Sequence, residues 1–229
     1  EGTIWINSQT WAAISGISTP ERLAECMASV ERMMGTEHGM MNVAPAFTKI
    51  DEGIGIITRF KPGWKENAAV FSHASAFTVV AWAKLGAGAQ AVDLFRRLLP
   101  LTKDPDHYRM EPYAFSQFCA GPAAGEEFGL GAYHWLTGTA AWMLRAMTDY
   151  ILGVHPEFDG LRINPSIDPA WREFRIRRRF RGAMYDIHVT NPNGVAHGVS
   201  SLSLDGQTVD GTLLPLPTAE RHEIKVVMG

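Results

Sequence analysis

The sequence predicts a mainly helical fold followed by a small antiparallel β region. Two observations support this: apolar residues recur at helical spacing through the first two thirds of the chain, and strict alternation replaces that spacing after Gly153. With 229 residues, of which 46% are hydrophobic, the chain can bury one large core, with or without a small appendage. We therefore divide it into residues 1–153 and 154–229.

Five helices are expected in the first part. Thr19 has the character of an N-cap and Pro20 suits the first helical position, so a helix begins there and runs to about Met34. The other helices are expected at residues 67–85, 89–99, 113–119 and 139–152. A long connection over residues 35–63 contains several glycines, and connections of that length are usually functional.

Strands are expected after residue 153. Apolar and polar residues alternate over residues 185–190 and 224–226, as in half-buried strands. Residues 202–206 end in Asp-Gly, which is a hairpin signal. The arginine-rich run over residues 171–182 alternates in the same way. We interpret it as one face of a sheet rather than as a nucleic-acid site.

Composition excludes several classes of protein. A net charge of −3 argues against a general role with nucleic acid or membranes, and no apolar run approaches the ~18 residues of a membrane span. Cys26 and Cys119 lie in apolar helical patterns, so we expect reduced thiols and a cytoplasmic location. The histidines show no zinc spacing. We therefore predict no metal site.

The run KPGWKENAAVFSH, residues 61–73, is the most informative stretch of the chain. A Pro-Gly turn leads into Trp64, Lys65 and Glu66, and an apolar stretch carrying His73 follows. An aromatic ring, a cation and a carboxylate beside a turn suit a sugar-binding surface. Taken alone, however, the run fits a solvated charge pair in front of a core helix better than a site. By itself, His73 on an apolar helix likewise fits a core histidine better than a ligand.

Two further segments change this interpretation. Residues 110–117 read MEPYAFSQ and residues 135–142 read WLTGTAAW. In this order and at these intervals, the three blocks resemble the C-terminal half of glycoside hydrolase family 94, the inverting disaccharide phosphorylases of the cellobiose and chitobiose type. The resemblance begins near residue 8 and continues through residues 150–167, 177–189 and 191–195. It covers nearly the whole chain.

The resemblance implies an (α/α)6 barrel, in which two rings of helices enclose the site, followed by a β domain. Residues 1–153 would then be the second half of the barrel and residues 154–229 the β domain. We expect a C-terminal part of a longer enzyme, inactive alone, whose partner is the N-terminal remainder of the same enzyme. The complete enzyme is expected to be a homodimer.

The implied reaction is reversible, inverting phosphorolysis of a β-linked disaccharide to an α-sugar 1-phosphate and a free sugar. Inorganic phosphate is the co-substrate, and no cofactor is expected. Phosphate is already an anion, so the reaction needs one protonated carboxyl group and no second carboxylate to activate water. The resemblance places the acid, an aspartate, upstream of Glu1. Glu111 is expected only to orient the site, so we expect no catalytic acid in this chain.

The resemblance assigns phosphate binding to His73, Gln117, Thr137 and Gly138. An imidazole, a hydroxyl group and the N–H groups at the start of a helix are suitable donors to an anion. Thr137 and Gly138 also fit an ordinary helix cap and turn, and these functions are compatible because the same N–H groups serve both.

Sugar binding is assigned to Lys65, Glu66 and Phe60. The family often has Gly-Gly after Lys-Glu-Asn, where this chain has Ala68 and Ala69, and the cellobiose enzymes tend to have tyrosine at the position of Phe60. These departures leave the disaccharide open. Two other functions also remain open: a glycoside hydrolase on the same barrel, and a noncatalytic fragment that needs its N-terminal partner.

Overall fold

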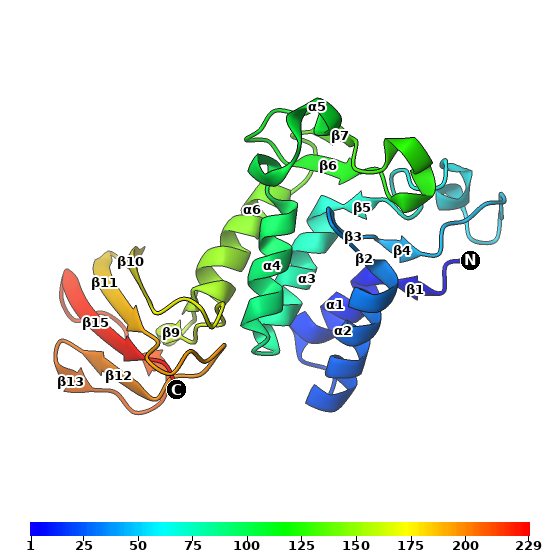
Figure 1. Ribbon diagram of the computed structural model, residues 1–229. Coiled ribbons are helices and arrows are strands. Elements are labelled where there is room, and N and C mark those ends of the chain that lie inside the picture. Colours follow the sequence, from blue (N-terminus) through cyan, green and yellow to red (C-terminus); the bar gives the residue numbers. More distant parts are fainter. The chain divides into compact units, whose positions relative to one another are not determined.

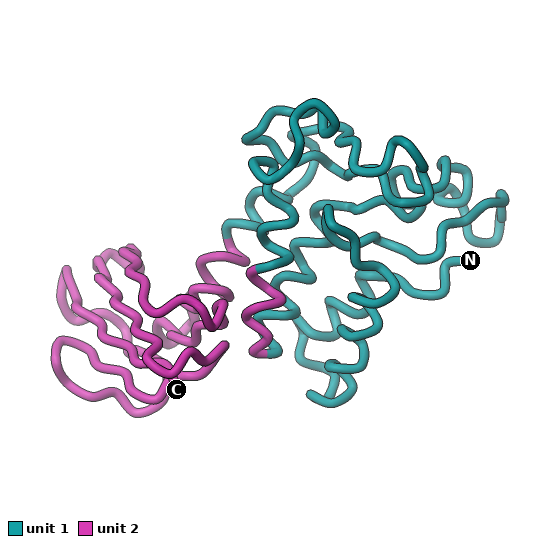
Figure 2. The backbone as a smooth tube through the Cα atoms, in the orientation of Figure 1, with its two compact units in different colours: residues 1–85, 93–144 teal, residues 86–92, 145–229 magenta.

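The computed structural model describes residues 1–229 and shows a mixed fold of helices and small sheets (Figure 1). The chain divides into two compact units, residues 1–85 with 93–144 and residues 86–92 with 145–229 (Figure 2). The expectation of a mainly helical first part is correct only in part, because short strands accompany its helices. The assignment of residues 1–153 to half of a barrel and of residues 154–229 to a separate β domain stays a prediction.

Six α-helices lie wholly or partly in the first unit. They are α1 (Ile6–Ser15), α2 (Pro20–Met34), α3 (Ser72–Lys84), α4 (Gly88–Leu98), α5 (Pro105–Tyr108) and α6 (Thr139–Arg145). The predicted start of α2 is confirmed, since the Thr19 hydroxyl accepts the Arg22 N–H at 3.4 Å. α4 lies within one residue of its predicted ends. Short 3-10 segments occur at Ile56–Arg59 and Pro100–Thr102, and at Pro122–Glu127, where a kink at Gly125 separates two such segments.

α3 is buried on nearly every side, because small or apolar residues surround its axis. Only His73 in its first turn and Lys84 in its last turn are not buried. The helix begins at Ser72 and not at the predicted Asn67. The residues before Ser72 are held in an extended conformation by strand pairing, which prevents an earlier start.

The strands of the first unit form three small antiparallel sheets. Two are pairs, β1 (Ile4–Trp5) with β4 (Val43–Ala44) and β2 (Gly35–Thr36) with β3 (Gly39–Met40). The third contains, in order, β5 (Val70–Phe71), β6 (Ser116–Cys119) and β7 (Gly131–His134). The predicted short helix over residues 113–119 is wrong, because β6 occupies its second half. β6 pairs on both sides, and this pairing outweighs helical spacing in so short a run.

The long helix predicted over residues 139–152 is present over almost that length, but only its first half is α-helical. α6 ends at Arg145 and continues as a π-helix over Ala146–Ile151. In the second unit, the buried carboxylate of Asp149 accepts hydrogen bonds from Arg178 at 2.9 Å and Arg145 at 3.3 Å. Two guanidinium groups thus offset the cost of burying this charge.

The sheet of the second unit contains five strands in the order β10-β11-β15-β12-β13. Their bounds are Glu173–Phe180, Ala183–Thr190, Arg221–Val227, Ser201–Leu204 and Gln207–Thr208. The predicted strands and the Asp-Gly hairpin are confirmed. The prediction of an antiparallel region is correct for the other strand pairs of this unit, whereas β11 and β15 run parallel. Alternation within a strand shows which face is buried but not the direction of its neighbour.

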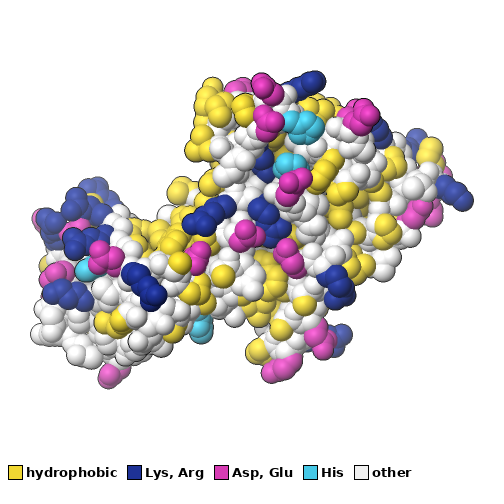
Figure 3. All heavy atoms as spheres, viewed as in Figure 1, with side chains coloured by type: hydrophobic (Ala, Val, Ile, Leu, Met, Phe, Trp, Pro, Cys, Tyr) yellow, Lys and Arg dark blue, Asp and Glu magenta, His cyan; other side chains and the backbone are white.

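A second sheet of this unit has the order β14-β9-β8, with bounds Leu213–Leu214, Leu161–Ile163 and Val154–Pro156. Tyr185, Ile187 and Val189 from β11, with Ile224 and Val226 from β15, form the buried face of the five-stranded sheet. Lys and Arg side chains gather on the end of the molecule that contains this sheet (Figure 3). None of the helices combines the length and the apolar character that a membrane crossing requires.

Candidate functional site

The three sequence blocks meet at one small sheet in the first unit. β5 follows the Lys-Glu-Asn block, β6 ends the Glu-Pro-Tyr block, and β7 leads into the Trp-Leu-Thr-Gly block (Figure 1). Val70 pairs with Cys119, and Phe118 pairs with Ala132. Segments separated by tens of residues therefore lie side by side, and they carry the predicted sugar and phosphate residues with them.

Lys65 and Phe60, both predicted sugar-binding residues, are in contact. The Lys65 Nζ atom lies 5.2 Å from the centre of the Phe60 ring and 5.4 Å from the centre of the Tyr133 ring. Neither Lys65 nor Glu66 takes part in an ion pair. Sequence reasoning missed Tyr133. It stands two residues before the WLTGTAAW block, and nothing in its own neighbourhood marks it.

The turn that carries Lys65 is stabilised by contacts of Lys61 and Trp64, the residues that precede it. The Trp64 indole N–H donates to the Glu127 carboxylate at 2.9 Å, and Lys61 pairs with the same carboxylate. These hydrogen bonds, from Lys61 and then Trp64, lower the pKa of Glu127 below its usual value. The Trp64 ring also packs on Phe118 of β6, with ring centres 5.5 Å apart.

Asn67, the third residue of the Lys-Glu-Asn run, is structural. Its buried side-chain amide donates to the Phe47 carbonyl at 2.9 Å and to the Phe60 carbonyl at 2.8 Å, and its oxygen accepts the Phe47 N–H at 2.8 Å. The second of these bonds fixes the backbone of Phe60. Ala68 follows with φ of 64°, a left-handed conformation that favours glycine. Thus Ala68 adopts a glycine-like backbone conformation where the family often has glycine.

The predicted phosphate residues His73, Thr137 and Gly138 come together at the start of α6. A Cβ atom on Gly138 would lie 3.2 Å from His73 Cε1 and 3.4 Å from His73 Nε2, so the imidazole lies directly against the glycine. His73 Nε2 is buried and has no hydrogen-bond partner. The Thr137 and Thr139 hydroxyl oxygens are 2.7 Å apart.

Aromatic rings surround the His73 imidazole. The Phe77 and Trp142 ring centres lie 4.9 Å and 6.4 Å from that of His73, and Trp142 meets Phe77 edge to face. Burial lowers the pKa of His73 below its usual value, because the charged form loses hydration. The imidazole is therefore neutral at pH 7 and can present one N–H to a ligand.

Gln117 lies in β6, the middle strand of the sheet, beside the strand that leads into His73. Its side chain is partly buried, and no hydrogen bond joins it to His73, Thr137 or Gly138. The structure thus places Gln117 on the shared sheet but does not bring it into contact with the other predicted phosphate residues.

Glu111 forms a pair with a histidine that the sequence analysis did not single out. The His134 Nδ1 atom lies 2.6 Å from the Glu111 carboxylate, and His134 pairs with Ser116 in the sheet. Hydrogen bonding at the Glu111 backbone and then from His134 lowers the pKa of the carboxyl group. A carboxylate of this kind is ionised at neutral pH, so it cannot donate the proton that a leaving sugar oxygen needs.

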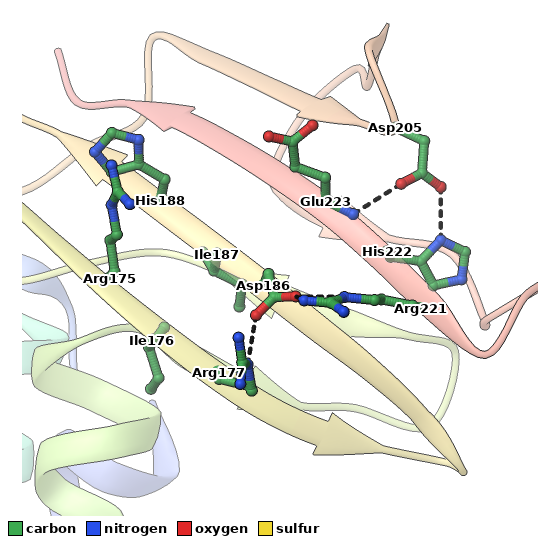
Figure 4. Close-up of a pocket in the computed structure, with 10 residues that line it drawn as sticks. All are labelled: Arg175, Ile176, Arg177, Asp186, Ile187, His188, Asp205, Arg221, His222 and Glu223. Carbon is green, nitrogen blue, oxygen red and sulfur yellow. Dashed lines mark hydrogen bonds and ion pairs between the residues drawn. The ribbon is translucent and has the colours of Figure 1, made fainter.

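A hollow of about 820 Å³ lies in the second unit and contains none of the predicted site residues (Figure 4). Two of its three arginines share one carboxylate: Asp186 accepts from Arg177 at 2.6 Å and from Arg221 at 2.7 Å. Asp205 likewise pairs with the buried His222 at 2.7 Å. All of the predicted sugar and phosphate residues belong to the first unit, so the candidate site is the one in that unit.

Comparison with known proteins identifies the family of the chain. Residues 1–153 match the family described as the glycosyl hydrolase 94 superfamily, catalytic domain, and the chain belongs to this family. The solabiose phosphorylase of Paenibacillus borealis is 37% identical over 94% of this chain and 28% of its own length. The N,N'-diacetylchitobiose phosphorylase of Vibrio proteolyticus is 36% identical over 100% of this chain and 29% of its own length.

A third relative, the 3-O-beta-D-glucopyranosyl-beta-D-glucuronide phosphorylase of Paenibacillus borealis, is 33% identical over 99% of this chain and 30% of its own length. The chain thus spans less than a third of the length of these relatives. A solved family GH92 alpha-mannosidase from Bacteroides thetaiotaomicron covers 96% of this chain and 23% of its own, with 13% identity. Its TM-score of 0.33 is too low to support an argument about fold.

Proposed function

We propose that the chain is the C-terminal part of an inverting glycoside phosphorylase, which uses inorganic phosphate to cleave a β-linked disaccharide into an α-sugar 1-phosphate and a free sugar. The observation that carries the proposal is the unpartnered, buried Nε2 atom of His73, which lies against Gly138 at the start of α6. An orphaned polar atom in a native structure calls for a partner. A phosphate oxygen bound to the imidazole and to the N–H groups at the start of α6 would supply one.

The surrounding groups suit an anion. The Thr137 and Thr139 hydroxyl groups are hydrogen-bonded to each other beside Gly138, and the first N–H groups of α6 have no partner within the helix. The positive end of the helix dipole adds to the attraction. We assign phosphate binding to His73, Thr137 and Gly138, and extend it to Gln117 on the neighbouring strand.

The sugar end of the site lies beside the same sheet, since the Lys65 ammonium lies 5.4 Å from the ring centre of Tyr133 in β7. Lys65 and Glu66 are free of ion pairs and supply donors and acceptors for hydroxyl groups, and Phe60 supplies an apolar ring. We assign these three residues to the sugar on the reducing-end side of the scissile bond, which is released as the free sugar. Membership of the family implies that the general acid is an aspartate outside residues 1–229. Glu111 does not suit that role, because its hydrogen bonds lower the pKa of its carboxyl group.

The proposal includes a cello- or chito-type substrate, no cofactor, and a homodimeric complete enzyme. It also includes a cytoplasmic location, which fits the two free cysteines, Cys26 and Cys119.

The experiment is an assay of the complete enzyme with a panel of disaccharides, in the presence and absence of inorganic phosphate. We expect cleavage only with phosphate and an α-configured sugar 1-phosphate as product, as judged by NMR. Cleavage at equal rates with and without phosphate would instead identify a hydrolase, and a β-configured product would contradict inversion.

The His73→Ala variant tests the site itself. Loss of one preorganised donor to developing charge should cost ~2–4 kcal/mol in kcat/KM for phosphate. If His73 is only a core residue, the variant will lose stability, but the folded enzyme will keep its KM for phosphate.

A further inference from the structure

Tyr133 has a position that the assignments above leave unexplained. Its ring centre lies 5.4 Å from the Lys65 Nζ atom, and the Phe60 ring centre lies 5.2 Å from the same atom. Since Lys65 forms no ion pair, these two rings are the groups that face its ammonium. Ammonium groups within about 6 Å of an aromatic ring centre are attracted to its face.

The backbone holds both partners in uncommon conformations. Lys65 has φ of 48° and Tyr133 has φ of 54°, which is the left-handed region that costs energy for residues other than glycine. The Tyr133 ring also contacts Phe118 of β6, at 6.0 Å between ring centres. Trp64, from the turn that carries Lys65, contacts the same Phe118 ring, at 5.5 Å between ring centres. Tyr133 is thus held on the same sheet that holds the turn of Lys65.

Lysine has a flexible stem, and an ammonium without a fixed partner samples many positions. Two rings restrict it while leaving its three N–H donors for hydroxyl groups. The Tyr133 side is also open to a ligand, because this residue is 50% exposed. A ring that is half exposed beside a fixed cation suits a sugar, whose hydroxyl groups contact the cation and whose C–H face contacts the ring.

We propose that Tyr133 is a positioning residue for the acceptor sugar, which acts by holding the Lys65 ammonium between its own ring and that of Phe60. The inference rests on the proposed function. It also bears on the departure at Phe60: the chain lacks a tyrosine at that position, and Tyr133 provides a second aromatic ring beside the same lysine. Tyr133 therefore contributes to which free sugar the enzyme accepts.

The test uses the complete enzyme in the direction of disaccharide synthesis. Tyr133→Leu should raise the KM for the free sugar about tenfold, the factor expected for a loss of about 1.4 kcal/mol from one cation–aromatic contact. The KM for the sugar 1-phosphate should stay within about twofold, because phosphate binds elsewhere. Tyr133→Phe keeps the ring and should restore the KM for the free sugar to within about twofold of the wild type.

Phe158→Leu is the matched control, because it removes a cation–aromatic contact of the same kind in the second unit, where Arg181 lies 6.0 Å from the Phe158 ring centre. It should leave both KM values unchanged. An unchanged KM for the free sugar in Tyr133→Leu would overturn the inference. A Tyr133→Phe enzyme as impaired as Tyr133→Leu would overturn it too, because the ring would then not be the group that acts.

A second readout does not depend on activity. Lysines are methylated with a ¹³C label, the Lys65 resonance is identified by its loss in Lys65→Met, and its ring-current shift is measured. The shift should shrink in Tyr133→Leu and persist in Tyr133→Phe, and an equal shift in all three proteins would overturn the inference. If the wild-type enzyme cleaves no disaccharide with phosphate, the proposed function fails, and this resonance and its response to added sugar still decide the role of Tyr133.

Discussion

His73 shows how neighbours give a common side chain a specific chemistry. Its ring lies among Phe77 and Trp142, which exclude water, and against Gly138, which leaves room for the imidazole. Burial favours the neutral ring, and the missing hydrogen bond at Nε2 leaves one strong polar group unused. Sequence reasoning could predict that His73 and Gly138 belong together only through the resemblance. It could not predict the aromatic surroundings, because Phe77 and Trp142 also fit a plain apolar core.

Gly138→Ala tests this arrangement at the scale of one methyl group. The added Cβ would lie 3.2 Å from His73 Cε1, so the imidazole must shift. We expect the KM for phosphate of the complete enzyme to rise about tenfold or more, in keeping with the usual cost of overpacking. The KM for the free sugar should change little, and steady-state kinetics measures both.

The matched control is Gly53→Ala. A Cβ there also has one close contact, 3.2 Å from the Asp51 carboxylate, and Gly53, like Gly138, does not have a positive φ. This variant should behave as the wild type does. Equal effects of both substitutions on phosphate use would mean that general strain, rather than displacement of His73, accounts for the loss.

At the scale of elements, the β5-β6-β7 sheet brings the residues of the candidate site together. The sequence did not predict this sheet. Helices with clear signals were predictable: Thr19 and Pro20 mark the start of α2, and the amphipathic run at α4 was found within one residue. Strands of two to four residues are too short to show alternation. β5 therefore merged with the apolar run of α3, and β6 was mistaken for a helix. Only the pairing of distant segments defines them.

The stability of the turn that carries Lys65 should depend on pH, because Glu127 accepts the hydrogen bonds that hold this turn. The folded-state pKa of Glu127 lies below its ordinary value of 4.5, because hydrogen bonds from Lys61 and Trp64 favour the carboxylate. The contribution of Glu127 to the stability of the folded turn is therefore fully present above pH 4.5. It is lost as the pH falls through the lowered folded-state pKa. We expect the Trp64 indole N–H to be protected from exchange above pH 4.5 and to lose protection on further acidification, as measured by NMR.

Glu127→Gln and Glu127→Ala separate the charge from the hydrogen bond. The amide oxygen of Gln can still accept the Trp64 N–H but does not titrate, so some protection should remain and its dependence on pH should disappear. Glu127→Ala removes the acceptor and should lose protection at every pH. Persistence of the wild-type pH dependence in Glu127→Gln would show that another carboxyl group controls the turn.

At the scale of the whole molecule, the chain passes between its two units more than once, since residues 86–92 belong with residues 145–229. Close backbone packing explains this assignment: a Cβ on Gly88 would lie 2.1 Å from the Ile167 carbonyl oxygen, and Gly86 lies against the His197 ring. No periodicity in the sequence records such contacts, because they depend on the absence of a side chain. The sequence nevertheless predicted the strands after residue 153, and β8 to β15 all lie there.

The chain of residues 1–229 should not catalyse phosphorolysis by itself. Glu111 is the carboxylate within the Glu-Pro-Tyr block, and its pKa is lowered rather than raised, whereas a general acid must hold its proton near neutral pH. Purified chain should therefore release no phosphate from a sugar 1-phosphate and an acceptor sugar. Adding the remaining part of the enzyme as a separate chain should restore turnover. Turnover by residues 1–229 alone would place the acid within them.

The parallel pairing of β11 and β15 has a consequence for how the second unit is made. Residues 191–220 separate the two strands along the chain, and β15 also pairs with β12 on its other side. On the ribosome, the β10-β11 and β12-β13 hairpins therefore emerge first, each with an edge that stays open until residues 221–227 have left the exit tunnel. Open edges pair readily with those of another nascent chain. Synthesis of this unit thus includes an interval in which two growing copies can exchange strands, and a chaperone that covers bare strand edges would act in that interval.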